Sequence, residues 1–238
     1  MFTTVVPHWD GMCGRISLFA DVETIADRFG VEITAPIKPR YNVAPRDWLG
    51  SITSEHPDAL ARLEWGLVPH WASSPEDGPR PINARREGVD EAAPFREPYA
   101  SRRCLVVIDG YYEWAETPAG KQPYRFERRD REPFALAGVW DRWEADDQTL
   151  DTVAILTASA VDEVAEVHDR MPVILNRSRE HDWLDSPPAD PRSVDLDPAW
   201  DETFHHYPIS TRVNNPEHDD PSVIEPAEGS GQPTLANF

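Results

Sequence analysis

The sequence predicts an α+β fold in a single domain, built around a mainly antiparallel sheet. The chain has 238 residues, the size of one ordinary domain that can bury a core without disulfides. Its 24 prolines indicate many turns and short strands. The expected strands are short and follow one another along the chain, which favours antiparallel pairing over a doubly wound parallel sheet.

The individual elements follow from local patterns. Residues 21–30 have the pattern of a short helix, because Asp21 suits the N-cap, apolar residues recur on one face, and Gly30 suits the end. Residues 105–108 form an apolar run closed by Asp109 and Gly110, which predicts a buried strand, a turn and a hairpin return at 111–114. Further strands are expected at 124–127, 133–139 and 152–158, a short helix or turn at 161–167, and another helix at 178–184.

The two ends of the chain differ from its middle. Residues 1–11 have no clear periodicity, and we interpret them as an extension before a domain that spans 12–226. Residues 227–238 belong to a Pro-, Gly- and acid-rich end and are expected to be a disordered tail. No long apolar run occurs, so we expect neither export nor a membrane partner, and a cytoplasmic location.

The charge balance is strongly acidic. The chain has 43 acidic and 23 basic residues, a formal net charge of -20, and only two lysines, Lys38 and Lys121. Such a surface is typical of a halophile's protein, here interpreted as haloarchaeal, although an ordinary acidic cytosolic protein is the alternative. Acidity argues against a nucleic-acid partner, yet the window 80–103 holds six arginines and four acids and is locally basic.

Two cysteines, Cys13 and Cys104, are present without a CxxC pair or a zinc-type spacing. The sequence therefore predicts no metal site, no cofactor and no disulfide. Cys104 precedes an apolar strand and is expected in the core, whereas Cys13 belongs to one of several short motifs. These motifs are MCGR at 12–15, YNVAP at 41–45, WGLVP at 65–69, PINARRE at 81–87, DGYYEW at 109–114 and HDRMP at 168–172.

In this order the motifs resemble those of the SOS-response-associated peptidase (SRAP) family of abasic-site processing proteins. The resemblance runs from Met12 to about Pro226 and implies a barrel-like β core flanked by short helices. It also implies a chemistry. In this family the cysteine becomes the first residue, and its amine and thiol trap the aldehyde of an abasic site as a thiazolidine, a covalent crosslink to single-stranded DNA that shields the lesion.

The resemblance assigns roles to residues that match the family motifs. Cys13 is the expected nucleophile, Glu113 assists opening of the sugar ring and reversal of the crosslink, and His168 is a general acid or base. Asn83 orients the amine and the sugar. The residues expected to contact DNA, by phosphate binding or by stacking on unpaired bases, are Arg15, Asn42, Trp65, Trp71, Arg85, Trp114 and Arg170. We expect a monomer.

One departure from the family pattern matters for the chemistry. The MCGR motif begins at Met12, and a cysteine inside a chain has an amide nitrogen, which cannot form a thiazolidine. Translation from Met12, removal of a propeptide by the protein's own thiol, or loss of capture each explain this, and we favour translation from Met12. Two other functions stay open: a hydrolase-like thiol peptidase that uses Cys13, His168 and Glu113, and a non-catalytic reader of modified bases.

Overall fold

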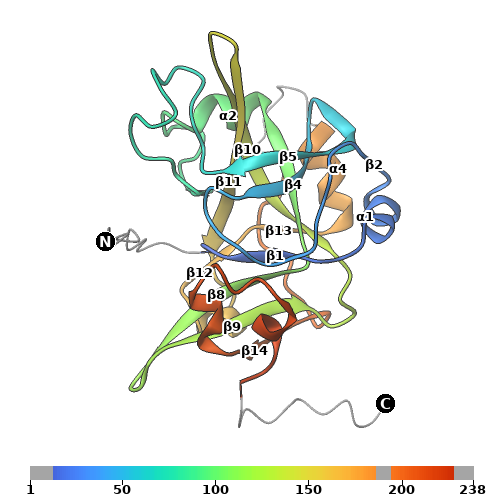
Figure 1. Cartoon of the computed structure of the whole chain (residues 1–238), viewed down its shortest axis with the longest axis vertical. Coiled ribbons are helices and arrows are strands. Elements are labelled where there is room, and N and C mark those ends of the chain that lie inside the picture. The colour runs from blue at the N-terminus through green and yellow to red at the C-terminus, as the bar shows by residue number, and fades with distance from the viewer. Residues whose placement is uncertain (1–12, 186–193, 228–238) are drawn as a thin grey trace.

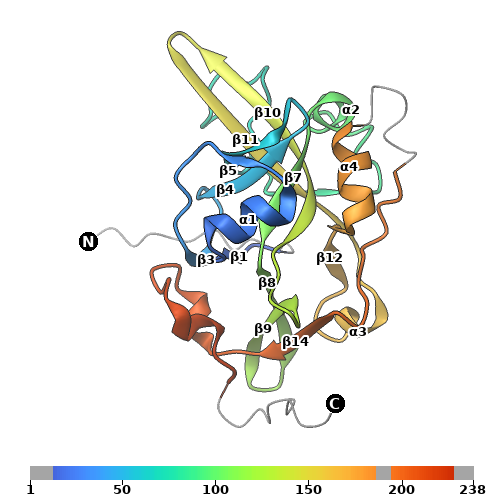
Figure 2. The same ribbon diagram turned by 90° about the vertical axis from the view of Figure 1, so that its right-hand side faces the viewer.

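The computed structural model of the protein describes residues 13–185 and 194–227 and contains two β-sheets with short helices around them (Figures 1 and 2). The predicted extension at 1–11 and the predicted tail beyond residue 227 lie outside the described residues. The elements of the larger sheet and its helices are α1 (Val22–Phe29), β2 (Glu32–Ile33), β4 (Trp48–Thr53), β5 (His56–Trp65), β6 (Asn83–Arg85), α2 (Arg96–Ser101), β7 (Arg103–Ile108), β10 (Phe134–Ala145), β11 (Gln148–Ser159), α3 (Asp162–Ala165), β12 (Arg170–Pro172), β13 (Ile174–Leu175) and α4 (Arg177–Asp185).

The smaller sheet has five strands in the order β14-β9-β8-β1-β3. Its strands are β1 (Ile16–Leu18), β3 (Arg40–Val43), β8 (Gly110–Thr117), β9 (Gly120–Arg128) and β14 (Phe204–Pro208), and two 3-10 helices, η2 (Thr211–Asn214) and η3 (Pro221–Ile224), follow β14.

Five strands of the larger sheet close into a barrel. Antiparallel pairs join β5 to β4, β4 to β7, β7 to β10 and β10 to β11, and a short parallel pair between β11 and β5 completes the ring. The predicted mainly antiparallel, barrel-like α+β fold is therefore confirmed. Beyond the ring, β10 and β11 continue as a long hairpin that projects from the molecule (Figure 2).

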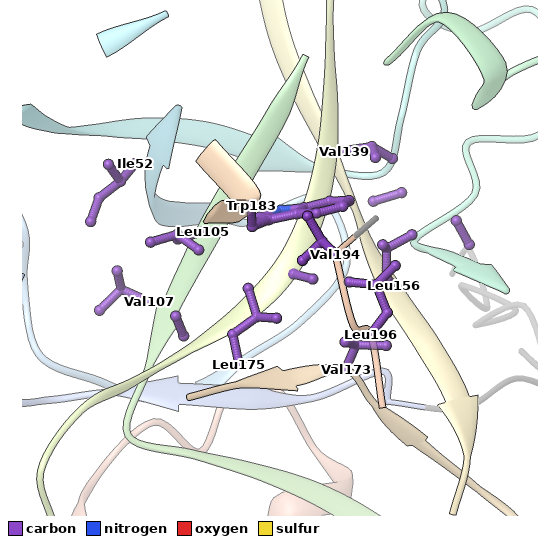
Figure 3. Packing of buried hydrophobic residues seen from close by; sticks show 14 of the residues in the cluster. Ile52, Leu105, Val107, Val139, Leu156, Val173, Leu175, Trp183, Val194 and Leu196 are labelled. Atoms are coloured by element: carbon purple, nitrogen blue, oxygen red, sulfur yellow. The ribbon is translucent and has the colours of Figure 1, made fainter. Parts of the chain in front are cut away.

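The barrel is filled by branched aliphatic side chains around one tryptophan. Trp183 of α4 has no exposed surface, and its indole N–H donates to the backbone oxygen of Cys104 at 3.0 Å. Figure 3 shows its ring lying between Leu105 of β7 and Leu156 of β11. A buried indole needs both apolar contact and a partner for its N–H, and this arrangement supplies both. Helix α4 therefore packs against the barrel through Trp183.

A second apolar cluster lies between the two sheets. It joins Ile16 of β1 and Tyr111 of β8 to Val106 of β7, Trp140 of β10 and other buried side chains, and it includes Cys13. The residue that the sequence singles out for chemistry therefore lies at the junction of the smaller sheet and the barrel.

Several local predictions are confirmed. The side chain of Asp21 accepts from the backbone N–H of Thr24 at 2.8 Å, and Gly30 ends the first helix in the left-handed conformation with φ 67°. The strands expected at 124–127, 133–139 and 152–158 lie within β9, β10 and β11, although the observed strands are longer or shifted by a residue. The helices expected at 161–167 and 178–184 correspond to α3 and α4, whereas α2 was not predicted.

The predicted hairpin of residues 105–108 and 111–114 is wrong. Strand β7 pairs with β4 and β10 in the barrel, whereas β8 pairs with β1 and β9 in the smaller sheet. The chain passes from one sheet to the other at Asp109, whose buried carboxylate accepts from the hydroxyl of Ser17 and from the backbone N–H groups of Phe19 and Ala20. These bonds fix the crossing in place of a turn.

Gly110 sits beside this crossing, directly against a buried guanidinium. A Cβ at this position would lie 2.5 Å from Cζ of Arg125. Arg125 cannot move away, because it is fully buried and bonds to Glu127, Ser17 and the hydroxyl of Tyr112.

Gly110→Ala is therefore expected to lower the free energy of unfolding by about 3 kcal/mol, the scale of overpacking in a rigid core. Chemical denaturation of the purified protein measures this. Gly14→Ala is the matched control, since its Cβ would meet nothing closer than 3.9 Å. Equal stability of the two variants would contradict the account of the crossing.

Candidate active site

Cys13 lies beside strand β8. The backbone N–H of Tyr112 donates to the oxygen of Arg15 at 3.1 Å, so the segment before β1 runs antiparallel to the strand that carries Glu113. The backbone N–H of Cys13 donates to Oε1 of Glu113 at 2.5 Å. Cys13 is fully buried and has a φ of 40°, in the left-handed region that a residue with a side chain rarely adopts.

Glu113 is a buried carboxyl group on β8, with 3% of its surface exposed. Burial raises its pKa to about 7, because the charged form loses its hydration; the positive field of His168 and the N–H of Cys13 oppose the shift. A carboxyl group with such a pKa can both give and take a proton near neutral pH.

His168 and Asn83 complete the group around Cys13. His168 follows α3, its side chain is 29% exposed, and it lies close enough to Glu113 to act on that carboxyl electrostatically. Its Nδ1 accepts from the backbone N–H of Arg170 at 3.1 Å. Asn83 of β6 points its Nδ2 at the backbone oxygen of Cys13, 3.5 Å away. The four residues expected to carry chemistry come together from four separate segments.

The thiol of Cys13 is held in its neutral form. Burial raises its pKa well above the ordinary value, and the negative charge of Glu113 adds to the shift. No three His, Cys, Asp or Glu side chains gather in a metal-type cluster within residues 13–185 and 194–227.

Two of the residues expected to contact DNA instead hold the chain's own C-terminal segment. The guanidinium of Arg15 donates to the backbone oxygens of Val213 and Asn214, at 2.5 and 3.2 Å. The buried side-chain amide of Asn42 donates to the oxygens of Val213 and Asn215, and its own oxygen accepts from Arg15. Arg15 and Asn42 thus hold the segment around η2.

Two further candidates for DNA contact, Trp65 and Arg170, also bond to other residues of the chain. Trp65 is fully buried, with its indole N–H donating to the oxygen of Ile82 at 2.9 Å, so it presents no ring face for a base. Arg170 forms a two-point ion pair with Glu87, at 2.9 and 3.1 Å, and also donates to the oxygen of Thr157. Glu87, a member of the PINARRE motif, was not predicted as its partner.

The remaining three candidates are available to a ligand. Trp71 is 62% exposed. Its neighbour His70 is fixed by Asp141, which accepts from the backbone N–H of His70 at 2.9 Å. Arg85 is exposed at the end of β6, and Trp114 is partly exposed, with its indole N–H donating to Asn214 at 2.8 Å. Arg85 lies two positions after Asn83 and makes no ion pair within the described part of the chain.

None of the helices in the described residues is both long enough and apolar enough to cross a membrane.

Comparisons with known proteins identify relatives of this chain. The chain is similar to the abasic site processing proteins YoqW and YoaM of Bacillus subtilis (strain 168), with 35% and 33% identity over 222 residues; both alignments cover 90% of this chain and 98% or more of the relative.

A crystal structure of a protein from Bacteroides thetaiotaomicron superposes with a TM-score of 0.80 at 29% sequence identity, covering 90% of this chain and all of the other. The sequence profile of the SOS response associated peptidase (SRAP) family matches residues 12–216, which contain Cys13, Asn83, Glu113 and His168. The chain therefore belongs to the SOS response associated peptidase (SRAP) family.

Proposed function

We propose that this protein captures abasic sites in single-stranded DNA as a covalent thiazolidine crosslink through Cys13, once the residues before Cys13 are absent. One observation carries the proposal: the backbone nitrogen of Cys13 donates a hydrogen bond to the carboxyl group of Glu113, at 2.5 Å. A nitrogen in this position, freed as an α-amine, has a proton donor and acceptor in contact with it. The two Bacillus subtilis relatives are named abasic site processing proteins, which supports abasic sites as the target.

The first step is addition of the amine to the aldehyde of the ring-opened sugar. The nitrogen lone pair forms a bond to the aldehyde carbon, and the carbonyl electron pair moves to the oxygen. That oxygen takes protons and leaves as water, which gives an imine. Glu113, with a pKa raised to about 7 by burial, is suited to these proton transfers near neutral pH. In this proposal His168, whose side chain is 29% exposed, acts on a sugar hydroxyl.

The second step closes the ring. The sulfur of Cys13 bonds to the imine carbon, and its proton passes to the nitrogen, so the complete reaction releases one water. Because thiol and amine belong to the same residue, closure is intramolecular and its effective concentration is very high. Asn83, whose amide points at the backbone oxygen of Cys13, holds the residue in position.

The structure favours capture over a thiol peptidase. A cysteine peptidase attacks with a thiolate that a neighbouring base generates. Here burial and Glu113 raise the pKa of the Cys13 thiol, and the Nδ1 atom of His168 accepts from its own chain. A protonated thiol is compatible with capture, because nitrogen attacks first and the imine that follows is a stronger electrophile than an amide.

The proposal is tested with three single-stranded oligonucleotides in molar salt, which suits the acidic surface. One carries an abasic site, one carries the tetrahydrofuran analogue that lacks an aldehyde, and one carries an intact base. We expect an adduct that survives denaturation with the first alone. Binding to all three without an adduct would support a reader of DNA instead, and turnover of a peptide substrate without an adduct would support a peptidase.

Arg85 offers a separate prediction about the path of the strand. Arg85→Ala is expected to weaken DNA binding about five- to tenfold and to reduce the slope of log affinity against log salt by about 0.7, the loss of one phosphate contact on a single strand. The control is Arg86→Ala, because Arg86 already pairs with Asp197 and Glu87. Fluorescence anisotropy with the tetrahydrofuran oligonucleotide measures both. Equal slopes for the two variants would remove Arg85 from the DNA path.

A further inference from the structure

The buried hydroxyl group of Tyr111, next to the site, makes no hydrogen bond within the described residues. The side chain of Tyr111 is fully buried, and its ring stacks on Phe126 with centroids 4.7 Å apart. Its hydroxyl has no hydrogen-bond partner among the residues that the structure describes. An unpaired buried hydroxyl costs about 1–3 kcal/mol, and phenylalanine would fill the same space without that cost.

The hydroxyl belongs to the same face of β8 as the catalytic carboxyl group. Successive side chains of a strand point to opposite faces, so Tyr111 and Glu113 share one face and Tyr112 takes the other. Tyr111 also packs in the apolar cluster that contains Cys13. Burial raises the pKa of Tyr111, and the charges of Cys13 and Glu113 add to the shift.

Tyr112 shows what the partnered state of such a hydroxyl looks like. On the opposite face, its hydroxyl donates to the oxygen of Tyr41 at 2.6 Å and accepts from Arg125 at 3.0 Å. The two adjacent tyrosines therefore differ: the hydroxyl of Tyr112 is bonded within the fold, and that of Tyr111 has no partner among the described residues.

We propose that the Tyr111 hydroxyl donates a hydrogen bond to the aldehyde oxygen of the ring-opened sugar while the nitrogen of Cys13 adds to the aldehyde carbon. This inference rests on the proposed capture reaction and adds a catalytic residue to it. Negative charge develops on that oxygen as the carbonyl electrons move onto it, and a fixed donor in a dry site stabilises such charge strongly. Burial keeps Tyr111 protonated, so it acts as a donor and not as a base.

The test compares Tyr111→Phe with Tyr112→Phe, two removals of a single hydroxyl from adjacent residues. Single-turnover crosslinking to the abasic oligonucleotide is followed from pH 5.5 to 8.5, together with the melting temperature. For Tyr111→Phe we expect a limiting rate about tenfold lower, the loss of one hydrogen bond in the transition state, with unchanged half-saturation and an unchanged or higher melting temperature. Tyr112→Phe should keep the rate and melt at a lower temperature.

The pH profile separates two roles of the hydroxyl. The titratable groups that act on Glu113 are Cys13, His168, Asp169 and Tyr111. If the hydroxyl acted on Glu113 and not on the aldehyde, its removal would shift the midpoint of the profile, and that result overturns the assignment. A Tyr111→Phe rate within twofold of the unmodified protein overturns it as well. Absence of an adduct with the unmodified protein would instead refute the proposed function, and the role of Tyr111 with it.

Discussion

Cys13→Ala is expected to lower the yield of the denaturation-resistant adduct more than 100-fold. The variant keeps an α-amine and can still form an imine, but it has no sulfur to close the ring, and an imine returns to aldehyde and amine in water. Quantitative gel electrophoresis after heating measures the loss. We expect the variant to fold. The change removes one sulfur atom from the apolar cluster between the two sheets and leaves only a small cavity there.

A lysine amine is the natural competitor for an aldehyde, and this chain allows a strict control. It contains two lysines, Lys38 and Lys121, and Lys121 pairs with Glu116. The double change Lys38→Arg and Lys121→Arg should leave the adduct unchanged. An adduct that persists in Cys13→Ala and disappears in the double lysine variant would move the nucleophile away from Cys13.

Glu113→Gln is expected to slow crosslinking about 100-fold, the usual contribution of a positioned acid or base. Glutamine keeps an oxygen that accepts from the nitrogen of Cys13, so the geometry of the site survives while proton transfer is lost. Single-turnover kinetics measures the rate. In the unmodified protein the rate should depend on the protonation of Glu113, whose pKa burial raises, and this dependence should disappear in the variant. A variant that crosslinks at the normal rate would show that the carboxyl group only binds.

The same change has a predicted effect on stability. The pKa of Glu113 is about 7 in the folded protein against an ordinary 4.5, so the native state binds more protons than the unfolded state between these values. Stability from this group therefore falls as pH rises from about 4.5 to about 7, by about 3 kcal/mol in total. Glu113→Gln should be more stable than the unmodified protein at pH 8, and the difference should vanish near pH 4.5.

The fold class and the grouping of Cys13, Asn83, Glu113 and His168 could be predicted from the sequence because their signals are local. Asp21 and Gly30 bound a helix by their own backbone preferences, and Cys13, Asn83, Glu113 and His168 belong to short motifs in a fixed order. The position of Tyr111 could have been predicted as well, since the alternation of side chains along a strand places it on the same face as Glu113.

The crossing at Asp109 and the fate of four DNA-contact candidates could not be predicted, because they depend on contacts between distant segments. Asp109 and Gly110 have the composition of a hairpin turn, yet bonds to Ser17 and Phe19 direct the chain into another sheet. Arg15 binds carbonyl groups almost 200 positions away. The sequence does not show whether an arginine or a tryptophan contacts a ligand or another segment of its own chain.

The mass of the crosslinked protein tests the central claim most directly. The protein is incubated with the abasic oligonucleotide, and the intact adduct and its proteolytic fragments are measured by mass spectrometry. The account predicts a chain that begins at Cys13 and carries the DNA with the loss of one water, both bonds lying on Cys13. An adduct on a chain whose Cys13 is still joined to Met12, or one attached at any other residue, would contradict it.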